Sequence, residues 1–155
     1  MNKEYRRGVG IFLINSENKL WVGKRIDLES NYWQMPQGGI DAFETPEIAM
    51  RRELMEEVGL QEGYKIIGKT KGWLRYRLPE DLVKIVWQGK YIGQEQIWFA
   101  CRFFGNDNQI NIDKDEKPEF SCWKWINPFD ATKFVIPFKK GLYNSILKQF
   151  GKHLT

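Results

Sequence analysis

Three glutamates crowd one short segment, Met50 to Leu60, which has the sequence MRRELMEEVGL. On a helix, Glu53, Glu56 and Glu57 share one face, because side chains at i, i+3 and i+4 project together. Carboxylates this close repel one another unless positive charge lies among them. Two interpretations follow: a solvated acidic face neutralised by the two preceding arginines, or a site for a hard divalent cation such as Mg²⁺ or Mn²⁺.

The sequence also marks where this helix begins and ends. Thr45 is a hydroxyl cap, and Pro46 suits the first helical position. Gly59 is a natural stop. The preceding stretch, WQMPQGGIDAFE (33–44), is expected to be irregular because a proline and a pair of glycines break any regular pattern. The acidic helix therefore follows a glycine-bearing loop directly.

Alternating and continuous apolar runs predict the strands that support this helix. The sequence has no repeat or linker, so we expect one domain over residues 1–155. Interspersed strands and helices without a regular βαβ order favour an α/β (α+β) fold, with a mixed sheet covered by helices. Strands are expected at 9–14, 20–25, 64–70, 73–78, 96–104 and 120–126, and helices at 45–59, from 127 and at about 137–150.

Composition excludes several classes of function. The net charge of +4 does not by itself predict a nucleic-acid partner. The single histidine, His153, lies two residues from the end, where chains usually fray, so a Ser-His-Asp mechanism or a His-ligated zinc site has no residues to use. Apolar runs are too short for a membrane span, and we expect a cytoplasmic protein. Cys101 and Cys122 are expected to be buried reduced thiols.

The 23 residues from Gly38 to Leu60 resemble the signature of the Nudix hydrolases at every defined position. That resemblance implies an α/β/α sandwich whose loop–helix–loop binds Mg²⁺ or Mn²⁺. It also implies hydrolysis of a nucleoside diphosphate linked to another group. The matching positions are Gly38, Glu44, Arg52, Glu53, Leu54, Glu56, Glu57, Gly59 and Leu60.

The resemblance also assigns roles to individual residues. It implies that Glu53, Glu56 and Glu57 are catalytic metal ligands and that Gly38 brings backbone to the metal. Glu44 and Arg52 are expected to support them, since an arginine can tether the loop by charge-assisted hydrogen bonds.

Segments outside the signature resemble the bacterial RNA pyrophosphohydrolase group, also described as dinucleoside polyphosphate hydrolases. They include YRRGVGIFLIN, VGKRID, YWQMPQGGI, GWLRYRLP, GQEQIWF and IPFKKGLY. This resemblance implies RNA 5′ ends and nucleotide polyphosphates as partners, with no DNA and no membrane, and we expect a monomer. In the segment KPEFSCW it implies that Glu119 joins the metal site or acts as base. The implied substrate-binding residues are Arg6, Arg25, Gln94, Gln96, Phe138 and Lys139.

Two departures from the group are visible. Phe43 stands where the group usually has a second glycine before the first signature glutamate, and Glu95 and Ile97 stand where a basic residue is common. Three functions stay open: removal of pyrophosphate from 5′-triphosphate RNA, hydrolysis of dinucleoside polyphosphates or mononucleotides without an RNA role, and non-catalytic binding of nucleotides or RNA.

Overall fold

The computed structural model describes residues 4–26 and 31–155. Residues 1–3 and 27–30 lie outside the described part of the chain. Asp27, the last residue of the segment VGKRID, is among them.

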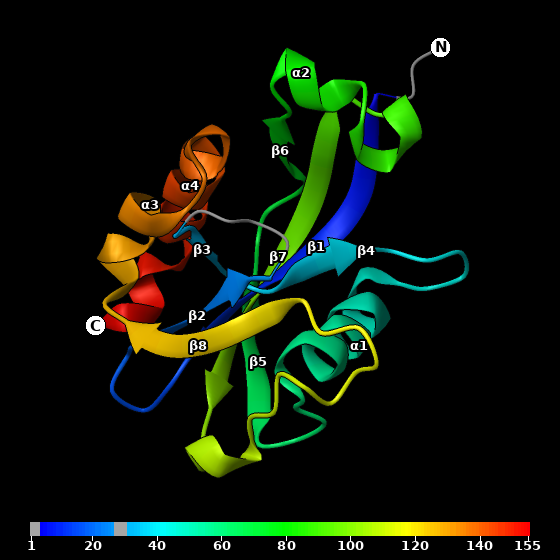
Figure 1. The fold of residues 1–155 in the computed structure, drawn as a ribbon. Coiled ribbons are helices and arrows are strands. Elements are labelled where there is room, and N and C mark those ends of the chain that lie inside the picture. The colour runs from blue at the N-terminus through cyan, green and yellow to red at the C-terminus, as the bar shows by residue number, and fades with distance from the viewer. Residues whose placement is uncertain (1–3, 27–30) are drawn as a thin grey trace.

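A mixed eight-stranded sheet forms the centre of the fold (Figure 1). Its main path runs β3-β2-β1-β7-β5, with β4 also pairing with β1, β6 with β7 and β8 with β2. The two central strands, β1 and β7, are parallel and all other pairs are antiparallel. The strands are β1 (Tyr5–Ile14), β2 (Leu20–Arg25), β3 (Trp33–Gln34), β4 (Gln37–Gly39), β5 (Tyr64–Lys69), β6 (Leu74–Arg77), β7 (Gly93–Phe103) and β8 (Phe120–Ile126).

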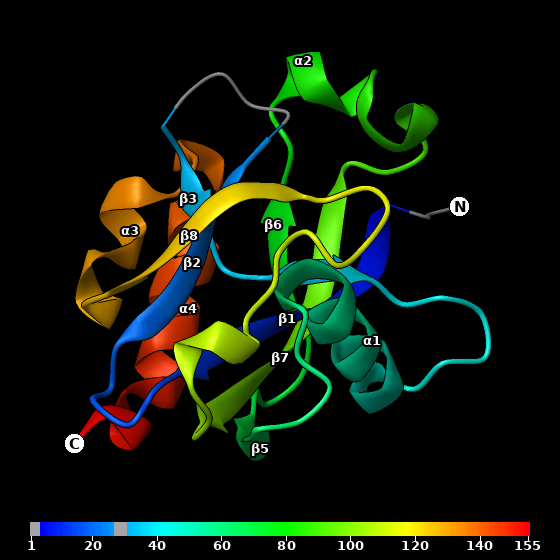
Figure 2. The same cartoon turned by 60° about the horizontal axis from the view of Figure 1, so that its bottom comes forward.

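Helices cover both faces of this sheet. Figure 2 shows α1 (Pro46–Val58) on one side of β1 and β7, and α3 (Ala131–Phe134) with α4 (Lys140–Phe150) on the other. The short α2 (Glu80–Val83) and the 3₁₀ turn η1 (Val86–Gly89) project beyond the ends of β6 and β7 (Figure 1). The expected α/β/α sandwich with a mixed central sheet is therefore confirmed. The remaining 3₁₀ turns are η2 (Asp107–Gln109), η3 (Pro128–Asp130), η4 (Pro137–Lys139) and η5 (Gly151–Leu154).

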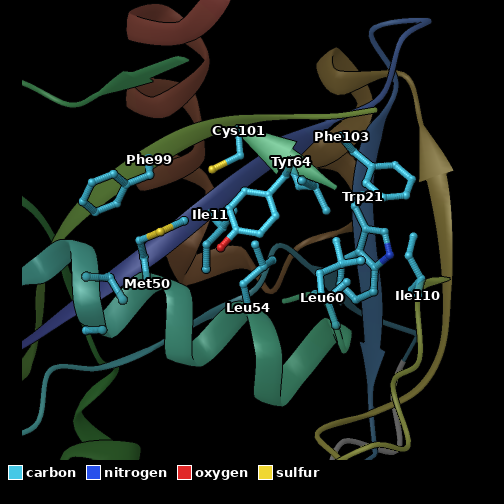
Figure 3. Close-up of a cluster of buried hydrophobic side chains, with 14 of the residues drawn as sticks. Ile11, Trp21, Met50, Leu54, Leu60, Tyr64, Phe99, Cys101, Phe103 and Ile110 are labelled. Atoms are coloured by element: carbon cyan, nitrogen blue, oxygen red, sulfur yellow. The ribbon is translucent and has the colours of Figure 1, made fainter. Parts of the chain in front are cut away.

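The first hydrophobic core joins α1 to the sheet (Figure 3). Met50 and Leu54 extend from the helix toward the strands, while Trp21 packs edge-on against Phe120 at 5.4 Å between ring centroids. Burying side chains of this size stabilises the helix by about 2 kcal/mol each. The acidic helix is thus fixed against the sheet by its apolar face. Other members include Ile11, Leu60, Tyr64, Phe99, Cys101, Phe103 and Ile110.

The second core lies between the sheet and α4. Leu142, Ile146 and Phe150 recur at helical spacing and are buried against Phe12, Trp98 and other strand residues. The hydroxyl of Tyr143 accepts a hydrogen bond of 2.8 Å from the backbone N–H of Met35. This contact ties the chain between β3 and β4 to α4.

Most of the predicted elements are confirmed. The strands at 20–25 and 120–126 have the predicted bounds, and the others differ by a few residues at their ends. The prediction of an irregular stretch over 33–44 was wrong in part, because it contains β3 and β4. These strands are only two and three residues long, and pairing with β2 and β1 creates them rather than local propensity.

Two further expectations are corrected. Cys101 is buried as expected, but Cys122 is exposed. From β8, Phe120, Trp123 and Trp125 pack in the first core, and the pairing of β8 with β2 is irregular beside Cys122. The end of the chain does not fray at His153: Arg102 donates a hydrogen bond of 3.2 Å to its carbonyl oxygen. Within the described residues, no helix is long and apolar enough to cross a membrane.

Candidate active site

Local sequence fixes both ends of α1 and therefore the direction of its carboxylates. The hydroxyl of Thr45 accepts a hydrogen bond of 3.2 Å from the backbone N–H of Ile48, as an N-cap does. At the other end Gly59 takes a left-handed conformation with a φ of 82°, and its N–H donates to the carbonyls of Leu54 and Met55. Such a glycine is a common helix end. The acidic face between these caps has a fixed orientation.

Arg52 is the centre of an ion-pair network on that face. Its guanidinium donates to Glu44 at 2.6 Å, to Glu53 at 2.9 Å and to Glu56 at 3.1 Å. It also donates to the carbonyl of Gly39 at 2.8 Å, which ties the loop to the helix. These hydrogen bonds, that of Glu44 being the strongest, raise the pKa of Arg52. The expected supporting contact between Arg52 and Glu44 is present.

The lowered pKa of Glu44 predicts that the free energy of unfolding depends on pH in the acid range. Hydrogen bonds from Arg52 lower its pKa from 4.5 to about 2. A lowered folded-state pKa contributes stability above the unfolded pKa, and this contribution is lost as pH falls from about 4.5 through about 2. We expect the Glu44→Gln variant to show a smaller loss of unfolding free energy over that window than the parent chain, measured by denaturant titration. The Glu62→Gln variant, at an exposed carboxyl, should behave as the parent does.

Glu57 and Glu53 lie buried beside each other, with Glu119 close to Glu57. Burial, followed by the negative charges of Glu53 and Glu119, raises the pKa of Glu57 well above its usual range. Burial also raises the pKa of Glu53, opposed by Glu57 and by Arg52. The backbone N–H of Gln37 donates to Glu57 at 3.2 Å. These carboxylates are mutually repulsive and only partly neutralised.

The donor set fits a hard divalent cation. Clustered carboxylate oxygens are the ligands that Mg²⁺ and Mn²⁺ prefer, and a cation between them would remove the repulsion that raises the pKa of Glu57. Within residues 4–26 and 31–155, no three His, Cys, Asp or Glu side chains already form a complete metal site. Glu56, the remaining predicted ligand, is paired with Arg52. When bound, such an ion polarises a phosphoryl oxygen and activates water.

Gly38 permits the close approach of the loop and the acidic helix. A Cβ at Gly38 would overlap the carboxyl group of Glu53. The carbonyl oxygen of Gly38 in turn lies close to Gly8. A Cβ on residue 8 would come 2.5 Å from this oxygen, so only glycine fits there. Absence of side chains at these two glycines thus brings backbone oxygen and carboxylate together.

This packing predicts the effect of adding one methyl group. We expect Gly38→Ala to displace the Glu53 carboxyl and to weaken Mn²⁺ binding at least tenfold, because a displaced carboxylate no longer has the correct distance and angle to the ion. Mn²⁺ affinity measured by electron paramagnetic resonance tests this. Gly141→Ala is the matched control: nothing lies within 4 Å of its added Cβ. In the helix it should stabilise the fold by about 0.5 kcal/mol and leave Mn²⁺ affinity unchanged.

A cleft of about 430 Å³ opens beside these carboxylates. It brings together most of the site residues predicted from sequence and further residues of β3, β4 and β6, among them Trp33, Gln37 and Tyr76. The predicted residues that line the cleft are Arg6, Arg25, Gly38, Glu53, Glu57, Gln94, Glu119, Phe138 and Lys139. The predicted residues that are not among its described lining residues are Glu44, Arg52, Glu56 and Gln96.

The paired glutamines of β7 take different positions. Gln94 lines the cleft, and its Nε2 is buried with no hydrogen-bond partner among the described residues. Gln96 is fully buried behind it, donating to Gln37 at 2.7 Å and accepting from the indole of Trp98 at 2.9 Å. Since Gln96 also donates to the Oε1 of Gln94, it orients the amide that reaches the cleft.

One part of the cleft wall was not among the site residues predicted from sequence. Trp87, Val86 and Leu82 line the cleft from η1 and α2, and the guanidinium of Arg6 lies 5.3 Å from the centre of the Trp87 ring. Trp87 and Gln88 have φ values of 51° and 60°, a region that non-glycine residues rarely adopt. No local pattern signals this conformation.

Phe43 explains the departure noted in the loop. Its φ is 71°, and its side chain is fully exposed. That region of φ favours glycine. The loop therefore keeps the backbone conformation that a glycine suits, with a phenylalanine at its surface.

A family model described as NUDIX domain matches residues 4–146 of this chain. The chain belongs to the NUDIX family. Curated relatives agree: a Zymomonas mobilis protein named RNA pyrophosphohydrolase is 47% identical over 99% of both chains. One of the same name from Wolbachia pipientis is 47% identical over 96% of this chain and 91% of its own. Divalent metal ions are a general requirement of NUDIX enzymes, which agrees with the carboxylate cluster.

Solved structures share the NUDIX fold at lower identity. The Escherichia coli dihydroneopterin triphosphate pyrophosphohydrolase has a TM-score of 0.72 at 18% identity, covering 95% of this chain and 99% of its own. A Caenorhabditis elegans Ap4A hydrolase has a TM-score of 0.66 at 17% identity, covering 97% and 99%. At these identities the likeness establishes the fold alone.

Proposed function

We propose that this NUDIX enzyme removes pyrophosphate from 5′-triphosphate RNA ends, leaving a 5′-monophosphate, and also hydrolyses dinucleoside polyphosphates. One observation carries the proposal: a single cleft combines buried carboxylates with cationic, amide and aromatic side chains suited to a nucleotide. The names and near-complete coverage of the relatives support the RNA substrate.

The carboxylates would hold Mg²⁺ or Mn²⁺. Glu53, Glu57 and Glu119 face the cleft, and we assign them as metal ligands with Glu56, which would turn from Arg52 when the ion binds. The carbonyl of Gly38 is a further oxygen donor. Arg52, bound to Glu44, keeps the loop and helix in register rather than contacting the substrate.

Other residues that line the cleft would bind the nucleotide. Arg25 and Phe138 both line the cleft, and a base between a guanidinium and an aromatic ring is a common arrangement in RNA binding. Lys139 would contact phosphate. The amide N–H₂ of Gln94, which has no hydrogen-bond partner among the described residues, would donate to a base or phosphate oxygen. Arg6 and Trp87 form a second pair of a cationic and an aromatic side chain. This pair favours dinucleoside polyphosphates, which have two bases, as an additional substrate.

Turnover with matched substrates tests the proposal. The purified chain is given a triphosphorylated RNA, a dinucleoside tetraphosphate and free nucleoside triphosphates, with Mg²⁺, with Mn²⁺ and with a chelator. We expect the highest kcat/KM on RNA, pyrophosphate or phosphate release only with metal, and ¹⁸O-labelled water to identify the phosphorus attacked. A preference for free triphosphates would favour a nucleotide-pool enzyme. Absence of hydrolysis with any substrate and metal would favour a binding module.

We further propose that the chain acts as a monomer in the cytoplasm. Size-exclusion chromatography with light scattering and localisation of a tagged chain test these two points. The expected result is a mass of 18.4 kDa, that of a single copy, at every protein concentration.

A further inference from the structure

A second cavity, of about 550 Å³, lies away from the NUDIX cleft, between β5 and the end of α4. Four lysines line it: Lys69 and Lys71 from β5 and the following turn, and Lys148 and Lys152 from α4 and η5. Among the described residues lining it there is no Asp or Glu, and none of the ion pairs found in the described part of the chain includes these lysines.

The wall of this lysine cavity also contains His153. Its Nε2 is buried and has no hydrogen-bond partner within the described residues. Burial, followed by the charges of Lys152 and Arg102, lowers the pKa of His153. An imidazole in these surroundings experiences positive charge without a counter-charge, so the cavity attracts anions.

Lysines on and beside α4 connect the cavity with the cleft: Lys139 lines the cleft, Lys140 follows it, and Lys148 lines the cavity. From Ala131 to Thr155 the chain has five lysines and no Asp or Glu, so the rest of the chain carries a slight excess of acids. Lys140, Asn144 and Lys148 are exposed at a spacing of four, which places them on one face of α4. The helix follows Lys139, which lines the cleft, and ends at the cavity. Its 11 residues span about 16 Å, because an α-helix rises about 1.5 Å per residue.

We infer that the lysine cavity binds phosphate groups, and that their source is the phosphodiester backbone of the RNA downstream of its 5′ end. This inference rests on the proposed function. Lysines along a groove follow a nucleic-acid backbone without reading its sequence. A few nucleotides of extended strand span the length of α4, so an RNA whose 5′ phosphates lie at the carboxylates reaches the cavity, while a dinucleotide does not.

Binding of RNA without a 5′ phosphate tests the inference separately from catalysis. The probe is a 5′-hydroxyl single-stranded RNA of about 20 nucleotides, followed by fluorescence anisotropy over a range of salt concentrations. The variants are Lys148→Ala/Lys152→Ala and the matched control Lys65→Ala/Lys114→Ala, which removes two exposed lysines outside the cavity. We expect about tenfold weaker binding in the first variant, with a salt slope smaller by about 0.7 for each phosphate that it no longer neutralises. The control should bind like the parent chain.

Hydrolysis gives the second readout. We expect the cavity variant to keep its kcat/KM on a triphosphorylated dinucleotide and to lose the advantage of long over short RNA. Inorganic phosphate, titrated while the ring resonances of His153 are followed by NMR, distinguishes the sources. If phosphate shifts the His153 resonances but the cavity variant binds RNA as tightly as the parent chain, the RNA backbone is not the source of the bound phosphate. Equal RNA binding by both variants with no phosphate shifts would overturn the site. Failure of the parent chain to hydrolyse any RNA would instead overturn the proposed function.

Discussion

Replacing Glu57 by glutamine is expected to lower kcat for pyrophosphate release on the order of 10³-fold, because the variant loses an anionic oxygen at the proposed metal site. Glu57 is buried, and its pKa is raised by burial and by the charges of Glu53 and Glu119. Glutamine keeps the shape and cannot take up the negative charge that burial and Glu53 disfavour at this position. Single-turnover kinetics with triphosphorylated RNA and saturating Mn²⁺ measure the loss.

Stability separates a catalytic effect from a folding effect in this variant. Because glutamine cannot carry the buried negative charge that Glu53 repels, the free energy of unfolding without metal should stay equal to that of the parent chain or rise. The increase in melting temperature on adding Mn²⁺ should shrink, since less binding energy is linked to folding. Glu116→Gln, at an exposed position, is the control. Full activity in Glu57→Gln would contradict its assignment as a metal ligand.

Replacing Arg52 by alanine is expected to destabilise the protein by about 3 kcal/mol. The guanidinium binds Glu44, Glu53 and the Gly39 carbonyl, and its loss leaves those carboxylates together without their cation. Denaturant unfolding measures the change. Arg52→Lys should recover only part of it, since an ammonium cannot reproduce the several directed hydrogen bonds of the planar guanidinium.

The adjacent Arg51 is the natural control for this prediction. It contacts the exposed Glu47 at 3.3 Å and the hydroxyl of Tyr64 at 3.2 Å. An exposed pair of this kind contributes less than about 1 kcal/mol. Equal destabilisation in Arg51→Ala and Arg52→Ala would show that the network contributes no more than ordinary surface charge.

Local sequence predicted the elements whose apolar pattern is strong. The strands at 20–25 and 120–126 follow from short apolar runs, and both ends of α1 follow from a hydroxyl cap and a C-terminal glycine. Pairing with distant strands creates β3 and β4, so a local pattern does not contain them. The same applies to the exposure of Cys122, which depends on which side of β8 is covered.

The resemblance predicted site residues both inside and outside the fixed spacing of the signature. The signature implied Glu53, Glu57 and Arg52, and the resemblance outside it implied Glu119, which the fold brings close to Glu57 in the same cleft. Paired glutamines that look equivalent in sequence, at 94 and 96, are separated by tertiary packing, which puts one in the cleft and the other behind it. Trp87 was missed because its wall depends on two positive φ values.

The parallel pairing of β1 with β7 has a consequence for how the chain is made. Partner residues such as Arg7 and Glu95 are 88 positions apart, and both strands lie in the middle of the sheet. A ribosome must therefore release nearly two-thirds of the polypeptide before its first strand finds its main neighbour. Contacts of such long range slow folding, and in the interval a nascent apolar segment, VGIFLI, stays open to chaperones or to aggregation.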